Sequence, residues 1–262
     1  MKKILIPICI IFIFLIYFEL GNSLEETGAL ITITQTWVTD EIIEMTGTRI
    51  KPLKKYTLSP IHKRLDSLPF FEDSSIFRFV SRDTPLTLLN YEPNDLVSIS
   101  GSHIDTAGRT GLRLRREAAE SLSIMALDFE KRFGIPLTVI STYRSAAYQQ
   151  RMWDLGKCSD TLCAPPGYSE HQLGLAMDIF DATTEDTYLK NKNYRKYIEW
   201  FKVGAQRYGW NQSYQKWETI DNYQIEPWHW RYLGVDMATK LSNLGWTYTE
   251  YVRFQEVLAR NY

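Results

Sequence analysis

The chain has 262 residues, of which 30 are Lys or Arg and 31 are Asp or Glu, so its formal net charge is −1. This balance argues against nucleic acid as a partner, because a phosphate backbone is recognised by clustered positive charge and the sequence has no basic stripe. The length permits one domain of about 170 residues together with an additional segment.

Residues 1–20 have the pattern of an export signal. Lys2 and Lys3 precede an apolar run, residues 4–18, that contains no charged side chain. This pattern predicts a secretory signal peptide or an N-terminal membrane anchor. The run is shorter than the roughly 20 apolar residues of a spanning helix, but the absence of a clear Ala-x-Ala cleavage site favours a retained anchor. The lysines are expected to stay cytoplasmic, so the rest of the chain would lie outside the membrane.

Residues 21–83 are predicted to form a membrane-proximal stalk or accessory segment. Residues 31–34 alternate like a short strand, and residues 37–46 could form one or two helical turns. Basic and proline-interrupted stretches follow, and their pattern indicates no function of their own.

Helical periodicity is strongest in residues 114–133, where apolar side chains recur at spacings of three and four and give the helix one apolar face. Gly134 is expected to end this helix. Residues 137–142 form a β-branched run that predicts a buried strand leading to Arg144. Ser145 is the expected N-cap of a helix that follows this strand.

Cys158 and Cys163 flank four residues of a predicted loop. In an exported protein such a pair can form a disulfide that stiffens the loop, which we favour over free thiols. A metal site is not expected here, because no second cysteine pair completes it.

The second half of the chain is predicted to mix helices and strands. Beyond the loop, a helix, a strand and two short helices are expected over residues 194–208, 223–232, 237–244 and 249–260. Thr247 and Glu250 form a capping-box pattern before the last helix. Strands and helices without regular βαβ spacing predict an α+β fold, with a small, mostly antiparallel sheet flanked by helices.

Two short segments contain half of the histidines in the chain. The first runs from Ser169 to Asp178 and includes His171, and the second contains Glu226 and His229. Two imidazoles and a carboxylate suit a catalytic zinc, whose charge lowers the pKa of water towards neutrality. We therefore interpret His171, Asp178 and His229 as zinc ligands and Glu226 as the general base. The alternative is that each histidine forms an ordinary ion pair with a nearby carboxylate.

His171 and Asp178 can share a metal only if the chain bends between them. Their odd separation would place them on opposite faces of a straight strand. Gly174 is the expected hinge.

The residues around these positions resemble the VanY-type D-alanyl-D-alanine carboxypeptidases, a group of zinc peptidases that act on bacterial peptidoglycan. The Ser-x-His-x-x-Gly-x-Ala-x-Asp block of this family is matched at residues 169–178, and its Glu-x-Trp-His block at residues 226–229. An upstream Tyr-Arg-Ser block is matched at residues 143–145, although Thr142 stands where glycine is expected. The resemblance implies a zinc D,D-peptidase-like (hedgehog/D,D-peptidase) fold for a catalytic domain over residues 84–262.

The resemblance also implies roles for three polar residues near the ligands. Arg144 would stabilise the negative oxygen that forms at the scissile carbonyl and help to bind substrate. Ser169 and Gln149 would bind the terminal carboxylate of the substrate. Each of these three could instead be a purely structural contact. Other polar residues are expected to have no catalytic role: Glu170, which should be solvated, and the surface histidines His62 and His103.

The function implied is zinc-dependent D,D-carboxypeptidase activity that removes the terminal D-alanine from peptidoglycan stem peptides. L,D-carboxypeptidase activity on tetrapeptide stems is the nearest alternative, and a non-catalytic cell-wall-binding protein is a second one. A serine-type peptidase is a weaker alternative, because Ser213 and Lys216 match Ser-x-x-Lys without the companion motifs. The protein is expected to be a monomer outside the cytoplasm, anchored to the bacterial cell membrane or else secreted or periplasmic.

Overall fold

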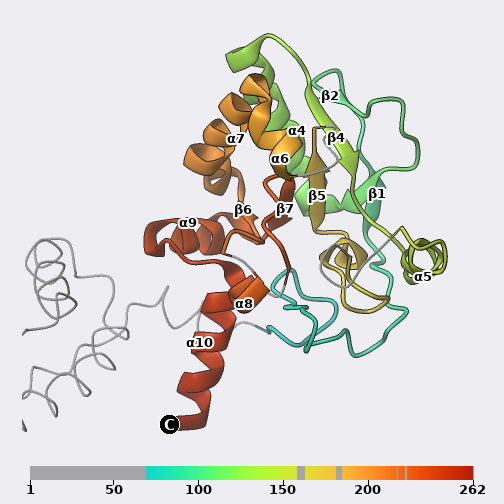
Figure 1. Ribbon diagram of the computed structural model, residues 1–262, viewed down its shortest axis with the longest axis vertical. Coiled ribbons are helices and arrows are strands. Elements are labelled where there is room, and N and C mark those ends of the chain that lie inside the picture. Colours follow the sequence, from blue (N-terminus) through green and yellow to red (C-terminus); the bar gives the residue numbers. More distant parts are fainter. Residues whose placement is uncertain (1–68, 158–162, 181–184, 217, 222, 262) are drawn as a thin grey trace, which may run out of the picture. The chain divides into compact units, whose positions relative to one another are not determined.

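A five-stranded sheet lies at the centre of the computed structural model, which describes residues 69–157, 163–180, 185–216, 218–221 and 223–261. Its spatial order is β2 (Ile104–Asp105), β4 (Leu137–Ser141), β5 (Ala176–Ile179), β7 (His229–Tyr232) and β6 (Trp210–Gln212) (Figure 1). Only β2 and β4 pair in parallel; the other neighbours in this sheet are antiparallel. A separate antiparallel pair joins β1 (Leu96–Ser98) to β3 (Arg113–Arg115). These pairings confirm the predicted α+β class with a small, mostly antiparallel sheet.

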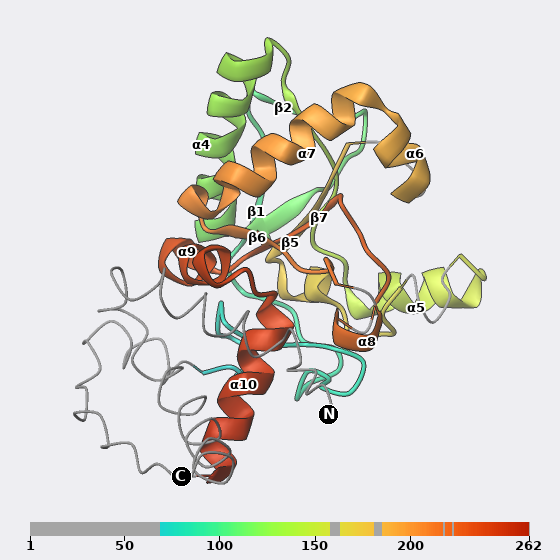
Figure 2. The ribbon, with the colours of Figure 1, turned by 60° about the vertical axis from the view of Figure 1, so that its left-hand side comes forward.

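Helices flank this sheet, and two of them, α4 and α7, lie side by side across it (Figures 1 and 2). None of the helices in the described part of the chain is long and apolar enough to cross a membrane. Over the described ranges the helices, two of them 3₁₀ helices (η), are α4 (Arg116–Phe133), α5 (Ala146–Asp154), η2 (Glu170–Leu173), α6 (Glu185–Lys190), α7 (Lys192–Gly204), η3 (Ala205–Tyr208), α8 (Glu218–Asp221), α9 (Gly234–Leu244) and α10 (Tyr248–Asn261).

The core lies between the sheet and the pair α4–α7. Phe129 of α4 packs against Phe201 of α7, with ring centroids 6.1 Å apart, and Phe201 packs in turn against Trp230 of β7. Met177 on β5 is paired with Trp230, and both side chains belong to the buried cluster. Because successive side chains of a strand point to opposite faces, the neighbours Asp178 and His229 are directed to the other face of the sheet.

Several predicted boundaries are confirmed by the structure. Helix α4 ends at Gly134, which adopts the left-handed conformation with a φ of 72°. The hydroxyl of Ser145 caps α5 by accepting a hydrogen bond from the backbone N–H of Tyr148. Thr247 and Glu250 form the predicted capping box at the start of α10. The expected helix over residues 194–208 is divided into α7 and η3, because Gly204 leaves the helical conformation with a φ of −132°.

The predicted strand over residues 223–232 is wrong in its first half. Only His229–Tyr232 pairs as a strand, β7. Pro227 has no N–H to donate to a ladder, and the N–H of His229 instead donates to the carbonyl of Glu226 at 3.2 Å. This turn lies just before β7, so Glu226 approaches the site from a loop.

Residues 69–83, assigned from sequence to the membrane-proximal segment, belong to the same compact unit as the sheet. Phe70 packs against Tyr251 of α10, with ring centroids 6.1 Å apart. Arg231 of β7 donates hydrogen bonds to the carbonyls of Ile76 and Arg78. The expectations for residues 1–20, 31–34 and 37–46, and for His62, fall outside the described residues.

Candidate metal centre

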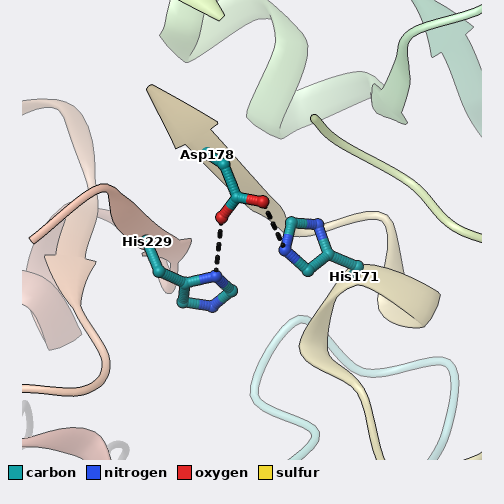
Figure 3. A group of neighbouring side chains, drawn as sticks. All are labelled: His171, Asp178 and His229. Atoms are coloured by element: carbon teal, nitrogen blue, oxygen red, sulfur yellow. Dashed lines mark hydrogen bonds and ion pairs between the residues drawn. The ribbon is translucent and has the colours of Figure 1, made fainter. Parts of the chain in front are cut away.

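Three buried side chains from different parts of the chain meet on the face of the sheet opposite α4 and α7. His171, Asp178 and His229 each present one ligand atom, and these atoms lie within 4.8 Å of one another (Figure 3). His171 belongs to η2, Asp178 to β5 and His229 to β7. The three residues predicted as metal ligands are thus brought close enough to share one ion.

A turn and a strand pairing produce this convergence. Gly174 follows η2 in the left-handed conformation, with a φ of 64°, and reverses the chain before β5 begins. Gly174 is therefore the hinge that the odd spacing of His171 and Asp178 required. Asp178 is directly opposite His229 in the antiparallel register of β5 and β7. Directly opposed residues of neighbouring strands have adjacent side chains, so the sheet itself places these two ligands together.

His171 is held in the tautomer that a metal ligand needs. Its Nδ1 atom lies 2.7 Å from the carbonyl oxygen of Thr142, which can only accept, so Nδ1 carries the proton. The Nε2 lone pair therefore points into the site, 3.2 Å from Oδ2 of Asp178. Burial and the neighbouring Arg144 lower the pKa of His171 to about 4, which keeps the ring neutral.

His229 lies between two carboxylates. Its Nδ1 atom is 3.0 Å from Oδ1 of Asp178, and its Nε2 atom is 2.9 Å from Oε2 of Glu170. Burial alone would lower the pKa of His229, but the hydrogen bonds with Asp178 and Glu170 raise it to about 10. Burial alone would raise the pKa of Asp178, but the charge of Arg144 and the hydrogen bond with His229 hold it well below the usual range.

These surroundings fit a dication. Both nitrogens of His229 face carboxylate oxygens, so a positive charge, either a proton or a metal ion, is needed between Nδ1 and Asp178. Two imidazole nitrogens and one carboxylate oxygen are the ligand set of catalytic zinc sites, which keep a further position open.

A further buried carboxylate, Glu226, lies beside the triad. Its Oε2 atom lies 3.9 Å from Nδ1 of His229, and its side chain is buried. Burial, which outweighs the attraction of His229, raises the pKa of Glu226 to about 8. A carboxyl group whose pKa lies near neutrality can both accept and return a proton.

Arg144 brings positive charge to the edge of the triad. Its Nη2 atom donates to Oδ2 of Asp178 at 2.6 Å and lies 3.1 Å from Nε2 of His171. Its Nε atom donates to the hydroxyl of Ser141, at the end of β4, which orients the guanidinium.

Ser169 and Gln149 are both buried, but their observed contacts are with the backbone. The hydroxyl of Ser169 accepts a hydrogen bond from the N–H of His171 and caps η2. The amide nitrogen of Gln149 donates to the carbonyl of Ala164 at 2.6 Å. Its amide oxygen is buried with no hydrogen-bond partner among the described residues. Such an oxygen could accept a hydrogen bond from a ligand.

Glu170, which was expected from the sequence to be solvated, is buried instead. This side chain is 4% exposed and faces both His229 and Ser213, rather than solvent. Its position immediately before a predicted ligand was visible in the sequence, but a partner 59 residues away was not.

The weak serine-nucleophile motif has a different role in the structure. The Ser213 hydroxyl donates to Oε2 of Glu170 at 2.6 Å. The Lys216 ammonium donates to the carbonyl of Gly245 and to Glu250. Its charge is therefore used in an ion pair at α10, which argues against a serine–lysine pair.

Two further expectations concern residues away from the triad. Cys163 is disulfide-bonded, and its predicted partner Cys158 falls outside the described residues. His103 forms an ion pair with Glu130 at a partly exposed position, as expected for a surface histidine.

Comparisons with known proteins agree with this geometry. The family model VanY, D-alanyl-D-alanine carboxypeptidase, matches residues 111–235. A Bacillus subtilis protein named "Putative carboxypeptidase YodJ" is 32% identical over 200 residues, which cover 72% of this chain and 71% of that protein. The solved LdcB LD-carboxypeptidase is 31% identical, with a TM-score of 0.60 over 69% of this chain and 87% of that chain. A mutant of the vancomycin resistance D,D-pentapeptidase VanY, solved with Zn(II), is 26% identical, with a TM-score of 0.52 over 69% of this chain and 99% of that chain.

The fold and the cluster of His171, Asp178 and His229 define a zinc metallopeptidase of the carboxypeptidase type. The chain belongs to the VanY family of D-alanyl-D-alanine carboxypeptidases. The resemblance inferred from the sequence motifs is thereby confirmed, as are the expected fold and the expected zinc cofactor.

Proposed function

We propose that this protein is a D,D-carboxypeptidase that removes the terminal D-alanine from peptidoglycan stem peptides, with zinc held by His171, Asp178 and His229. The convergence of these three ligands with Glu226 is the observation that carries the proposal. The family description and the D,D-pentapeptidase neighbour support the choice of bond.

The side chains around the triad divide the chemistry of amide hydrolysis among them. When bound, zinc activates water and polarises the scissile carbonyl. Glu226 takes the proton of the attacking water and returns it to the leaving amine. Arg144 stabilises the negative charge that develops on the carbonyl oxygen.

A carboxypeptidase must also hold the free carboxylate of its substrate. We assign this task to Ser169, Gln149 and Arg144. The buried amide oxygen of Gln149 supports a contact between Gln149 and substrate, because among the described residues it has no hydrogen-bond partner. A carboxylate cannot donate to this oxygen, so an N–H group of the substrate would have to supply that hydrogen bond.

An L,D-carboxypeptidase that acts on tetrapeptide stems is the second candidate. It is favoured by one observation, the similarity to the LdcB LD-carboxypeptidase at 31% identity and a TM-score of 0.60. Purified protein should be given defined pentapeptide and tetrapeptide stems, with and without a chelator, while released D-alanine is measured. We expect the pentapeptide to be cleaved with at least tenfold higher kcat/KM, in a reaction that the chelator abolishes. Preference for the tetrapeptide would establish the second candidate instead.

A cell-wall-binding protein without turnover is a third candidate. The presence of the three proposed ligands together with the proposed base, Glu226, argues against it. Zinc binding without release of D-alanine from either stem would establish it.

We further propose that the enzyme acts outside the cytoplasmic membrane as a monomer, held by residues 1–20. The uncharged apolar run of residues 4–18 supports the anchor. Fractionation of cells that express the tagged chain tests it: the protein should remain with membranes after washing with salt, whereas release into the medium would show cleavage.

A further inference from the structure

A buried carboxylate lies behind one of the proposed zinc ligands, on the side away from the metal. Oε2 of Glu170 is 2.9 Å from Nε2 of His229, and the two side chains are 4% and 2% exposed. The other ring nitrogen, Nδ1, faces Asp178 at 3.0 Å. We propose that Glu170 is a positioning residue, which fixes the tautomer and ring orientation of His229 so that Nδ1 is free to bind zinc.

The hydrogen-bonding rules of imidazole carry the first step. An ionised carboxylate can only accept, so the contact with Glu170 requires a proton on Nε2. In a neutral ring, the lone pair then belongs to Nδ1, which is the atom that belongs to the triad. Without Glu170, the ring could carry its proton on Nδ1 and donate it to Asp178, and that proton would occupy the position of the metal.

Glu170 is itself held by groups from two other elements. Ser213, which follows β6, donates its hydroxyl proton to Oε2 at 2.6 Å. Nη1 of Arg231 on β7 lies 3.8 Å from Oε1, and the Arg231 side chain is fully buried. The ring of Tyr214 stacks on that of His229, with centroids 4.7 Å apart and planes inclined by 23°. The imidazole is therefore constrained at its edge by a carboxylate and at its face by an aromatic ring.

The two ligand histidines obtain their orientation from partners of different chemistry. His171 donates Nδ1–H to a backbone carbonyl, which no substitution at Thr142 would remove. His229 depends on a side chain, and that side chain belongs to the residue immediately before His171. Removal of such an outer partner of a metal-binding histidine typically costs about 10–100-fold in metal affinity or activity.

The inference rests on the proposed zinc site, and its test measures zinc binding rather than peptide hydrolysis. The zinc dissociation constant is measured by competition with a chromogenic chelator for the parent, Glu170→Ala, Glu170→Gln and Ser213→Ala. We expect the zinc affinity of Glu170→Ala to fall about 10–100-fold. Glu170→Gln should bind zinc better than Glu170→Ala, because a glutamine carbonyl can still accept the Nε2 proton. Ser213→Ala should show a smaller loss than Glu170→Ala.

Asp221→Asn provides the matched control, because Asp221 is also a buried carboxylate but accepts hydrogen bonds from the backbone N–H groups of Gln215 and Lys216. This variant should lose thermal stability and keep the zinc affinity of the parent. A folded Glu170→Ala protein with a dissociation constant within threefold of the parent would overturn the positioning role. An equal loss of zinc affinity in Asp221→Asn would also overturn it, because the effect would then be structural.

A measurement on the unsubstituted protein covers the case in which Glu170→Ala does not fold. ¹⁵N NMR of the zinc-loaded chain should show a protonated Nε2 and a metal-bound Nδ1 for His229. A proton on Nδ1 would reject the proposal. Failure of the parent to bind zinc would contradict the proposed metal site, a result distinct from either outcome for Glu170.

Discussion

Asp178 and His229 face each other across the antiparallel strands β5 and β7, and Oδ1 of Asp178 lies 3.0 Å from Nδ1 of His229. Two of the three proposed ligands are thus placed by backbone hydrogen bonding in a sheet whose other face is packed against α4 and α7. Sites on strands are held more rigidly than sites on loops. The third ligand, His171, is placed by the turn at Gly174.

Replacement of Glu226 by alanine should abolish hydrolysis and spare metal binding. Glu226 is the proposed proton carrier, and general acid–base catalysis by such a group contributes about 10²–10⁴-fold to rate. We expect kcat for release of D-alanine to fall by about 10³-fold or more, while zinc content stays near that of the parent. Turnover at the rate of the parent would contradict the assignment.

Replacement of His171 or His229 by alanine should remove the metal itself. Each substitution deletes a ligand atom of the triad, so zinc content by atomic spectroscopy should fall to background. The increase in Tm that zinc produces in the parent should disappear as well, because a ligand stabilises only the state that binds it. His103→Ala is the control: His103 also pairs with a carboxylate, Glu130, but lies outside the triad, and the variant should retain zinc.

Replacement of Arg144 by alanine should reduce catalysis without loss of metal. The guanidinium donates to Asp178 at 2.6 Å and is the charge proposed to stabilise the oxyanion. Loss of one such donor typically lowers kcat by about 10²–10³-fold. Arg113→Ala is the control, because Arg113 is partly exposed over the ring of Tyr143. An equal loss of activity in both variants would show that positive charge in general, rather than Arg144, is required.

Gly174→Ala should damage the turn between His171 and Asp178. An added Cβ would lie 2.7 Å from the side chain of Leu96, in a residue whose φ is already +64°. Gly134→Ala provides a matched control, because Gly134 also ends a helix with a positive φ but has nothing within 4 Å of an added Cβ. In both variants the free energy of unfolding should fall by roughly 1–2 kcal/mol, which is the cost of placing alanine in the left-handed conformation. Only Gly174→Ala should also lose zinc affinity, and equal zinc binding in the two variants would refute the importance of this turn for the site.

Asp73→Asn should destabilise the protein in a pH-dependent manner. Burial alone would raise the pKa of Asp73, but hydrogen bonds from the N–H groups of Leu88 and Thr87 and from Arg78 lower it. A depressed pKa stabilises the folded state above the pKa of the unfolded chain, and this contribution is lost as the pH falls through the folded-state value. At pH 7 the free energy of unfolding of the variant should be lower than that of the parent by about 1–2 kcal/mol. This difference lowers Tm by about 2–8 °C.

The difference in Tm between this variant and the parent should narrow below about pH 4, the ordinary pKa of aspartate. Asp186→Asn is the control, because its ion pair with Lys190 is exposed on both sides and should contribute little. A difference in Tm that does not change between pH 7 and pH 3 would contradict the electrostatic origin of the effect.

Elements with strong local patterns were predicted well, and short or context-dependent ones were not. The helical period of residues 116–133 and its glycine cap are visible within one segment, and so is the capping box before α10. Strand β6 and helix α6 were missed because a few residues carry too little periodicity. The strand expected from residue 223 starts only at His229, because the turn at Glu226 depends on a hydrogen bond to Tyr214, in a different segment.

The sequence by itself determined the residue types of the metal centre, the order of the motifs and the need for a bend between His171 and Asp178. These are properties of residue chemistry and spacing along one chain. Only the tertiary structure decided that Asp178 and His229 lie opposite each other, and that Glu170 is a buried partner of His229 rather than a solvated side chain. Glu170 is 43 positions from Ser213 and 59 positions from His229 along the chain. Contacts over such separations arise from strand register and packing, which no local pattern specifies.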